Sequence, residues 1–82
     1  MGPEERDDYS ADIRFGEWLR SRRLQKGLSV EVSAKLAELS VRRLKGLEMG
    51  LSGRGITRPE AARLGLIYDV AVTDIIERAS ER

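Results

Sequence analysis

Ser29 to Gly50 reads SVEVSAKLAELSVRRLKGLEMG and contains two short helical patterns separated by a brief break. A serine stands just before each pattern, at Ser29 and at Ser40, where its hydroxyl can cap a helix. We therefore predict one helix at about 30–37 and a second at about 41–48, with Gly50 as the natural stop of the second. The connection between them is only about three residues long, so the two helices must pack closely.

The second of these helices has two distinct faces. An α-helix turns by about 100° per residue, so Leu44 and Leu47 fall on one side, which we expect to be buried. Arg42, Lys45 and Gly46 fall on the opposite side, which we expect to be exposed. A glycine inside a helix costs about 1 kcal/mol relative to alanine. Gly46 is explained either by close approach to another surface, such as a groove, or by packing against a neighbouring helix or simple tolerance.

Helical patterns also cover the rest of the chain, and no strand or repeat pattern is present. Phe15 and Leu19 share one face of a helix at about 12–26. Thr57 and Glu60 have the spacing of a capping box at the start of a helix at about 58–68, and a last helix is expected at about 73–80. Several inward positions stay open between neighbours: Val30 or Leu36 beside Ala34 and Ala37, Ile67 or Tyr68 beside Ala61 and Leu64, and Ile75 or Ile76.

This order of elements indicates an all-α fold, a compact domain of five helices over residues 11–82. Residues 1–10 lack apolar periodicity, and we expect them to form a flexible acidic N-terminal segment. The helix pair at 29–48 has the spacing of a helix-turn-helix unit.

The composition excludes several kinds of site. The 82 residues include no cysteine and no histidine. Disulfides, thiolate or imidazole metal sites and the commonest catalytic bases are therefore excluded, and we expect no metal, no cofactor and no enzymatic activity. No apolar run approaches the ~20 residues that span a bilayer, and the N-terminus does not resemble a signal peptide, so we expect a cytoplasmic protein with no membrane partner.

The net charge of +1 hides a segregation of charge. Between Arg14 and Arg58 there are 11 basic and four acidic residues, a net charge of +7. The two ends together carry four basic and 10 acidic residues, a net charge of −6. Segregated positive charge favours binding of a polyanion, because each neutralised phosphate releases a counterion, although a solvated helical surface also accounts for it.

Residues 15–50 resemble the Xre/lambda-repressor helix-turn-helix family, which includes the lambdoid phage repressors. The matching spacing runs without gaps through Leu19-Arg20, Arg23, Gly27-Leu28-Ser29, Ala34, Leu39-Ser40, Leu44, Leu47-Glu48 and Gly50. The resemblance implies a lambda-repressor-like DNA-binding domain whose helix at 41–48 lies in the major groove of double-stranded DNA. It implies base-reading roles for Val41, Arg42, Arg43 and Lys45, and phosphate contacts from Ser29, Ser40, Arg54 and Arg58.

The resemblance also implies a structural ion pair between Arg23 and Glu48. The helical rotation independently turns Glu48 inward, where a carboxylate needs a partner. Three positions depart from the family pattern. Val30 replaces a common glutamine, Glu38 replaces the usual glycine of the turn, and Ser33 occupies a usually apolar position.

Two functions from different classes are compatible with these features. The first is a sequence-specific transcriptional regulator of the repressor type, which would bind DNA as a homodimer. The last helix, with Val72, Ile75 and Ile76, is the candidate dimer surface, although ordinary core packing explains these residues equally well. The second is a protein-interaction module on the same fold, an antitoxin-like or co-regulator protein that binds a protein partner. No arrangement of a base and a nucleophile supports an enzyme.

Overall fold

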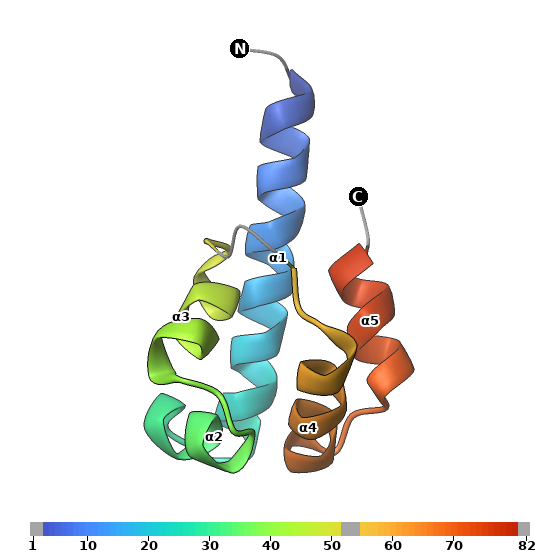
Figure 1. The fold of residues 1–82 in the computed structure, drawn as a ribbon. Coiled ribbons are helices and arrows are strands. Elements are labelled where there is room, and N and C mark those ends of the chain that lie inside the picture. The colour runs from blue at the N-terminus through green and yellow to red at the C-terminus, as the bar shows by residue number, and fades with distance from the viewer. Residues whose placement is uncertain (1–2, 52–54, 81–82) are drawn as a thin grey trace.

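The computed structural model describes residues 3–51 and 55–80, with their side chains from Ile13 onward. It contains five helices and, within the described residues, no strand: α1 (Pro3–Gln25), α2 (Val30–Leu36), α3 (Val41–Met49), α4 (Arg58–Tyr68) and α5 (Val72–Ser80). In Figure 1 α1 runs through the middle of the molecule, with α2 and α3 on one side and α4 and α5 on the other. The all-α fold of five helices is thus confirmed. No helix in the described part of the chain is both long enough and apolar enough to cross a membrane.

The start of α1 was wrongly predicted. The helix begins at Pro3 and not near residue 12, so its first turns extend beyond the other helices in Figure 1. Proline has no N–H to leave unpaired in a first turn, and its fixed φ suits that position. Residues 4–15 contain no glycine or further proline, so nothing in the backbone interrupts the helix. Apolar periodicity, which begins only at Phe15, was the wrong guide to the start of this helix.

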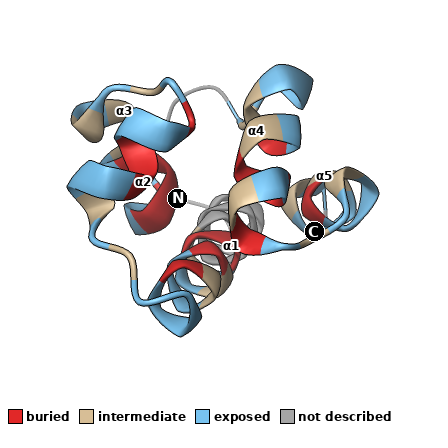
Figure 2. Ribbon diagram, turned by 90° about the horizontal axis from the view of Figure 1, so that it is seen from below, coloured by how far each residue is buried: buried red, intermediate tan, exposed pale blue. Residues whose placement is uncertain are grey.

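The core forms where all five helices meet. Its buried apolar side chains are Phe15, Leu19, Ala34, Ala37, Leu44, Leu47, Ala61, Leu64, Tyr68 and Ile75. Figure 2 shows these buried stretches facing one another across the bundle. The structure decides each inward position that the sequence left open. Tyr68 is buried and Ile67 only half-buried, and Ile75 is buried and Ile76 only half-buried. On α2, Val30 packs against the core and Leu36 is exposed.

Helix α1 approaches α3 closely at Gly16. A Cβ atom at this position would lie 2.2 Å from the carbonyl oxygen of Glu48 and 2.7 Å from that of Leu47. No side chain fits at such a distance, so glycine is required there. This contact fixes the position of α3 against the long helix.

The turn between α2 and α3 is built without glycine. Glu38 takes its place with φ 60°, in the left-handed region that glycine usually fills. The N–H of Leu39 donates to the carbonyl oxygen of Ala34 at 2.8 Å, which closes the C-terminus of α2. A non-glycine residue in this conformation costs of the order of 1 kcal/mol, so the helix-turn-helix geometry is kept at some expense of stability.

Candidate nucleic-acid interface

Helix α3 is held at its start by Ser40 and buried along one side. The Ser40 hydroxyl accepts a hydrogen bond from the N–H of Arg43 at 3.0 Å, and the helix ends at Gly50, whose φ is 72°. Leu44 and Leu47 are buried in the core. Arg42 and Lys45 are exposed, as the helical rotation predicted. One short helix therefore anchors itself with leucines and presents two cations to solvent.

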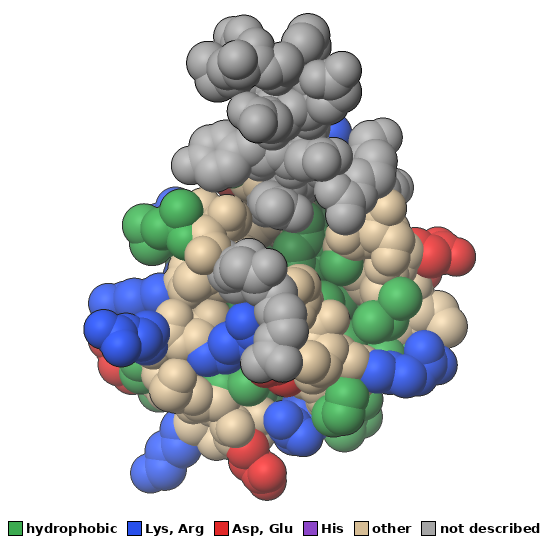
Figure 3. All heavy atoms as spheres, turned by 45° about the horizontal axis from the view of Figure 1, so that its top comes forward, with side chains coloured by type: hydrophobic (Ala, Val, Ile, Leu, Met, Phe, Trp, Pro, Cys, Tyr) green, Lys and Arg blue, Asp and Glu red, His purple; other side chains and the backbone are tan. Residues whose placement is uncertain are grey.

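The exposed side of α3 forms the wall of a shallow hollow of about 720 Å³. Figure 3 shows Lys and Arg side chains at the left edge of the molecule, on the side where α3 lies in Figure 1. The lining residues are Ser40, Val41, Arg42, Arg43, Lys45, Gly46, Met49 and Leu51. The structure thus brings together the four residues predicted to read bases. Met49 and Leu51, which are 60% and 59% exposed, add apolar side chains to the edge of this hollow, and no sequence pattern had singled them out.

Gly46 lies on a side of α3 that no neighbouring helix packs against. A Cβ atom built on it would meet no atom of the described residues within 4 Å. Packing against a neighbouring helix, one of the explanations considered for this glycine, is therefore wrong. Close approach to an external surface remains a prediction, as does simple tolerance.

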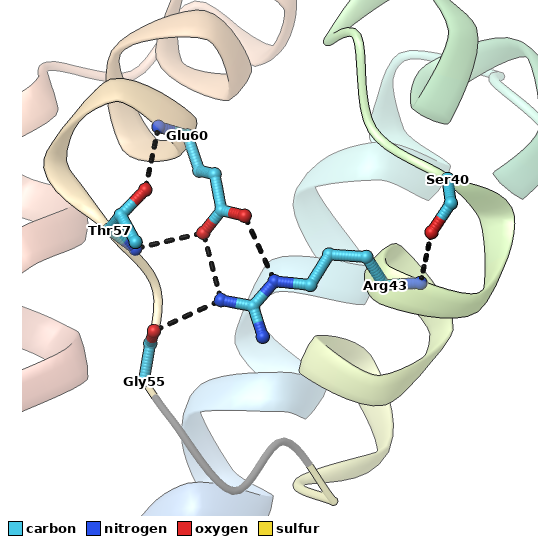
Figure 4. Close-up of polar contacts among 5 residues, drawn as sticks. All are labelled: Ser40, Arg43, Gly55, Thr57 and Glu60. Carbon is cyan, nitrogen blue, oxygen red and sulfur yellow. Dashed lines mark hydrogen bonds and ion pairs between the residues drawn. The ribbon is translucent and has the colours of Figure 1, made fainter.

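The side chain of Arg43 pairs with the start of α4. Its Nε and Nη2 atoms donate to the two carboxylate oxygens of Glu60, each at 2.9 Å, and Nη2 also donates to the carbonyl oxygen of Gly55 at 3.0 Å. Figure 4 shows this guanidinium reaching from α3 to the start of α4. Arg43 borders the hollow, but its guanidinium is paired with Glu60. The base-reading role that the resemblance implies for Arg43 stays a prediction, and its pairing with Glu60 argues against that role.

Glu60 is fixed from two sides. The sequence identified it only as part of a capping box, and that box is present: the N–H of Thr57 donates to Glu60 Oε1 at 2.9 Å, and the N–H of Glu60 donates to Thr57 Oγ1 at 3.3 Å. The hydrogen bond from Arg43, with the backbone N–H of Thr57 in support, lowers the pKa of Glu60 from 4.5 to about 2. The carboxylate therefore remains ionised at any physiological pH.

The predicted phosphate contacts lie at different places in the structure. Ser29 and Ser40 are exposed N-caps of α2 and α3, where each hydroxyl accepts a hydrogen bond from its own helix. Arg58 is exposed at the first position of α4. Arg54 lies outside the described residues. Capping is thus an established role for both serines, and contact with phosphate stays a prediction.

The ion pair between Arg23 and Glu48, which the resemblance implies, is present. Arg23 Nε donates to Glu48 Oε2 at 2.7 Å and Nη2 donates to Oε1 at 3.0 Å, with both side chains at least nine-tenths buried. Arg23 Nη1 also donates to the carbonyl oxygen of Leu28 at 2.8 Å. The hydrogen bond to Glu48 raises the pKa of Arg23. This pair joins α1, α3 and the turn before α2.

Ser33, one of the departures from the family pattern, is buried on α2. Its hydroxyl and that of Tyr68 have no partner that satisfies hydrogen-bond geometry among the described residues. Burial raises the pKa of Tyr68, and the nearby Ser33 hydroxyl opposes that rise. These two hydroxyl oxygen atoms are therefore buried polar atoms that lie beside the apolar core.

Helix α5 supplies less free surface than its sequence suggested. Ile75, a candidate dimer contact, is only 1% exposed and belongs to the core, so that assignment is corrected. Val72 and Ile76 are half-buried and pack against the same core. The large exposed side chain in this region is Leu66 on α4, at 86%, which sequence patterning did not single out.

Comparison with known proteins places this geometry among helix-turn-helix regulators. Neither family models nor curated protein sequences give a match. Among solved structures, the restriction-modification controller protein C.AhdI from Aeromonas hydrophila is 30% identical, with a TM-score of 0.72 over 84% of this chain and 97% of that one. The clp gene regulator ClgR from C. glutamicum, 24% identical, shares the fold with a TM-score of 0.67 over 85% of this chain and 88% of its own. The chain belongs to the Xre/lambda-repressor-type helix-turn-helix family.

Proposed function

We propose that this protein is a sequence-specific DNA-binding regulator whose helix α3 enters the major groove. The observation that carries the proposal is the two-sided character of α3, which buries Leu44 and Leu47 while it exposes Arg42 and Lys45 on a hollowed face. Such a helix is anchored rigidly and has free cations where a duplex would lie. The regulatory roles that the names of C.AhdI and ClgR state support the same conclusion.

Each exposed residue of α3 has a defined task in this proposal. The fork of Arg42 matches the O6 and N7 acceptors of guanine, and Val41 suits the methyl group of thymine. Lys45 lies one turn of helix further on and contacts a base edge or a phosphate. Gly46 carries no side chain, so the backbone of α3 can approach the groove there. Ser29, Ser40 and Arg58 are the proposed phosphate contacts.

We also propose that two copies of the chain bind together. A single short helix reads only a few base pairs, and paired half-sites about one helical turn apart are the usual solution. The surface proposed for the dimer is the exposed part of Val72 and Ile76 on α5. Ile75 has no part in it, because it is buried in the core of its own chain.

A binding titration tests the DNA-binding function directly. Arg42→Ala and Lys45→Ala should each weaken binding to duplex DNA by about 1–3 kcal/mol, or about 5- to 150-fold, because each removes a direct contact. Arg14→Ala removes one exposed cation from α1 and should leave the affinity nearly unchanged. Fluorescence anisotropy at several salt concentrations measures all four proteins. Absence of binding by the unaltered protein at low salt would contradict the proposal and favour the protein-interaction module.

A further inference from the structure

The ion pair between Arg43 and Glu60 removes a cation from the face of α3 that holds Arg42 and Lys45. Toward the described residues, the guanidinium donates three hydrogen bonds of 2.9–3.0 Å, two to the carboxylate of Glu60 and one to the carbonyl oxygen of Gly55. The side chain of Arg43 is 25% exposed and that of Glu60 is 13% exposed. Fork-to-fork pairing of this kind fixes the orientation of both groups.

Glu60 cannot easily release this arginine. The capping box with Thr57 also holds Glu60, through hydrogen bonds that do not involve Arg43 (Figure 4). If Arg43 moved to a phosphate, a mostly buried carboxylate would lose its cation, which is strongly unfavourable. The low pKa of Glu60 excludes release by protonation at physiological pH. The pair is therefore a fixed part of the folded protein.

The Arg43–Glu60 pair lies beside the exposed cations of α3. Arg43 borders the same hollow as Arg42 and Lys45, so the charge that Glu60 neutralises belongs to this face of α3. A third free cation would add attraction to phosphates of any sequence, because such contacts carry no base information. We propose that Glu60 determines specificity at this interface: by holding Arg43 inside the protein, it limits sequence-independent binding to DNA. This inference rests on the proposed DNA-binding function.

Glu60→Gln is the variant that separates charge from helix capping. Glutamine also serves in a capping box, so the bond to the N–H of Thr57 can persist while the charge that holds Arg43 is lost. Affinity for random-sequence duplex DNA should then rise several-fold at low salt. The slope of log Kobs against log salt concentration should become steeper by about 0.9, the value for one added phosphate contact.

Two further variants identify the source of any change. Glu77→Gln removes the same charge from the exposed surface of α5 and should leave the slope unchanged. The double variant Glu60→Gln, Arg43→Gln should return the slope to that of the unaltered protein, because the released cation is gone. The double variant also tests the proposal by itself if Glu60→Gln alone fails to fold. A slope shallower than that of the unaltered protein by about 0.9 would mean that Arg43 already contacts phosphate in the unaltered protein, which contradicts the proposal.

The outcomes distinguish this inference from the function on which it rests. Binding by the unaltered protein with an unchanged slope in Glu60→Gln would overturn the role of Glu60 and leave DNA binding intact. A steeper slope that persists in the double variant, or that appears equally in Glu77→Gln, would also overturn it. No binding by any of the proteins would overturn both proposals.

Discussion

Two glycines within helices, Gly16 and Gly46, have opposite surroundings. Gly16 sits where α1 meets the backbone of α3, and a Cβ atom there would lie 2.2 Å from a carbonyl oxygen. Gly46 has no atom within 4 Å of the corresponding position. The first glycine is required by the fold. The second lowers the stability of α3, and no packing contact among the described residues requires it. Its role is therefore to be sought in contact with another molecule.

Alanine at these two positions should therefore have opposite effects on stability. Gly46→Ala should raise the free energy of unfolding by about 0.5–1 kcal/mol, because alanine is the better helix former. If α3 approaches DNA closely there, the same change should weaken DNA binding about fivefold or more, equivalent to about 1 kcal/mol. Denaturant unfolding and anisotropy measure the two quantities. Unchanged DNA affinity in a more stable Gly46→Ala protein would mean that the glycine is merely tolerated.

Gly16→Ala provides the matched comparison. It should lower the free energy of unfolding by about 1–3 kcal/mol, since α1 and α3 would be forced apart. A stable Gly16→Ala protein would contradict the close contact between these helices.

Single residues also mark the limit of what the sequence could predict. Helical rotation placed Arg42, Lys45, Leu44 and Leu47 correctly, because those positions depend only on the geometry of one helix. It could not show that Arg43 would be held by Glu60, 17 residues away in sequence. That pairing depends on how α3 and α4 pack, which no local pattern encodes.

Among the elements, the helix boundaries near good caps were predicted closely. Ser29, Ser40 and Thr57 each cap a helix at the expected position, because a cap is a local interaction between a side chain and the next few N–H groups. The start of α1 was missed because Pro3 is a weaker signal than apolar periodicity. Ser33 was identified as unusual, but its lack of a hydrogen-bond partner became visible only in the packed core.

The link between α3 and α4 should give the protein a defined acid sensitivity. Folding lowers the pKa of Glu60 from 4.5 to about 2, chiefly through the hydrogen bond from Arg43. The unfolded chain therefore binds more protons between these two values, so this stabilisation is complete above pH 4.5 and is lost as the pH falls toward 2.

Glu60→Gln measures the size of that link. At neutral pH the variant should be less stable than the unaltered protein by about 1–3 kcal/mol, as expected for hydrogen bonds to a charged group. The difference should shrink toward zero as the pH approaches 2, where Glu60 itself becomes protonated. Denaturant unfolding followed by far-UV circular dichroism gives the free energies, and Glu77→Gln serves as the exposed control. A difference independent of pH would contradict the ionic nature of the link.

On the scale of the whole molecule, the distribution of charge and the arrangement of the helices both support the proposed binding of DNA. The excess of positive charge lies between Arg14 and Arg58, the part of the chain that contains the helix-turn-helix unit. The fold positions α3 through the glycine contact and the Arg23–Glu48 pair, so Arg42 and Lys45 are presented from a rigid base. Composition was compatible with a polyanion as partner and with a solvated helical surface, and the exposed cations of α3 support the proposal of duplex DNA.

Selection from a random library of duplex DNA, followed by sequencing, is the most direct test of sequence-specific recognition. Sequence-specific binding by a dimer predicts enrichment of one motif with two inverted half-sites about 10 base pairs apart, because each copy of α3 reads one half-site. Arg42→Ala should enrich a motif with relaxed preference at one position in each half-site. Recovery of unrelated sequences after repeated rounds, with no motif enriched above the starting library, would contradict sequence-specific recognition of DNA.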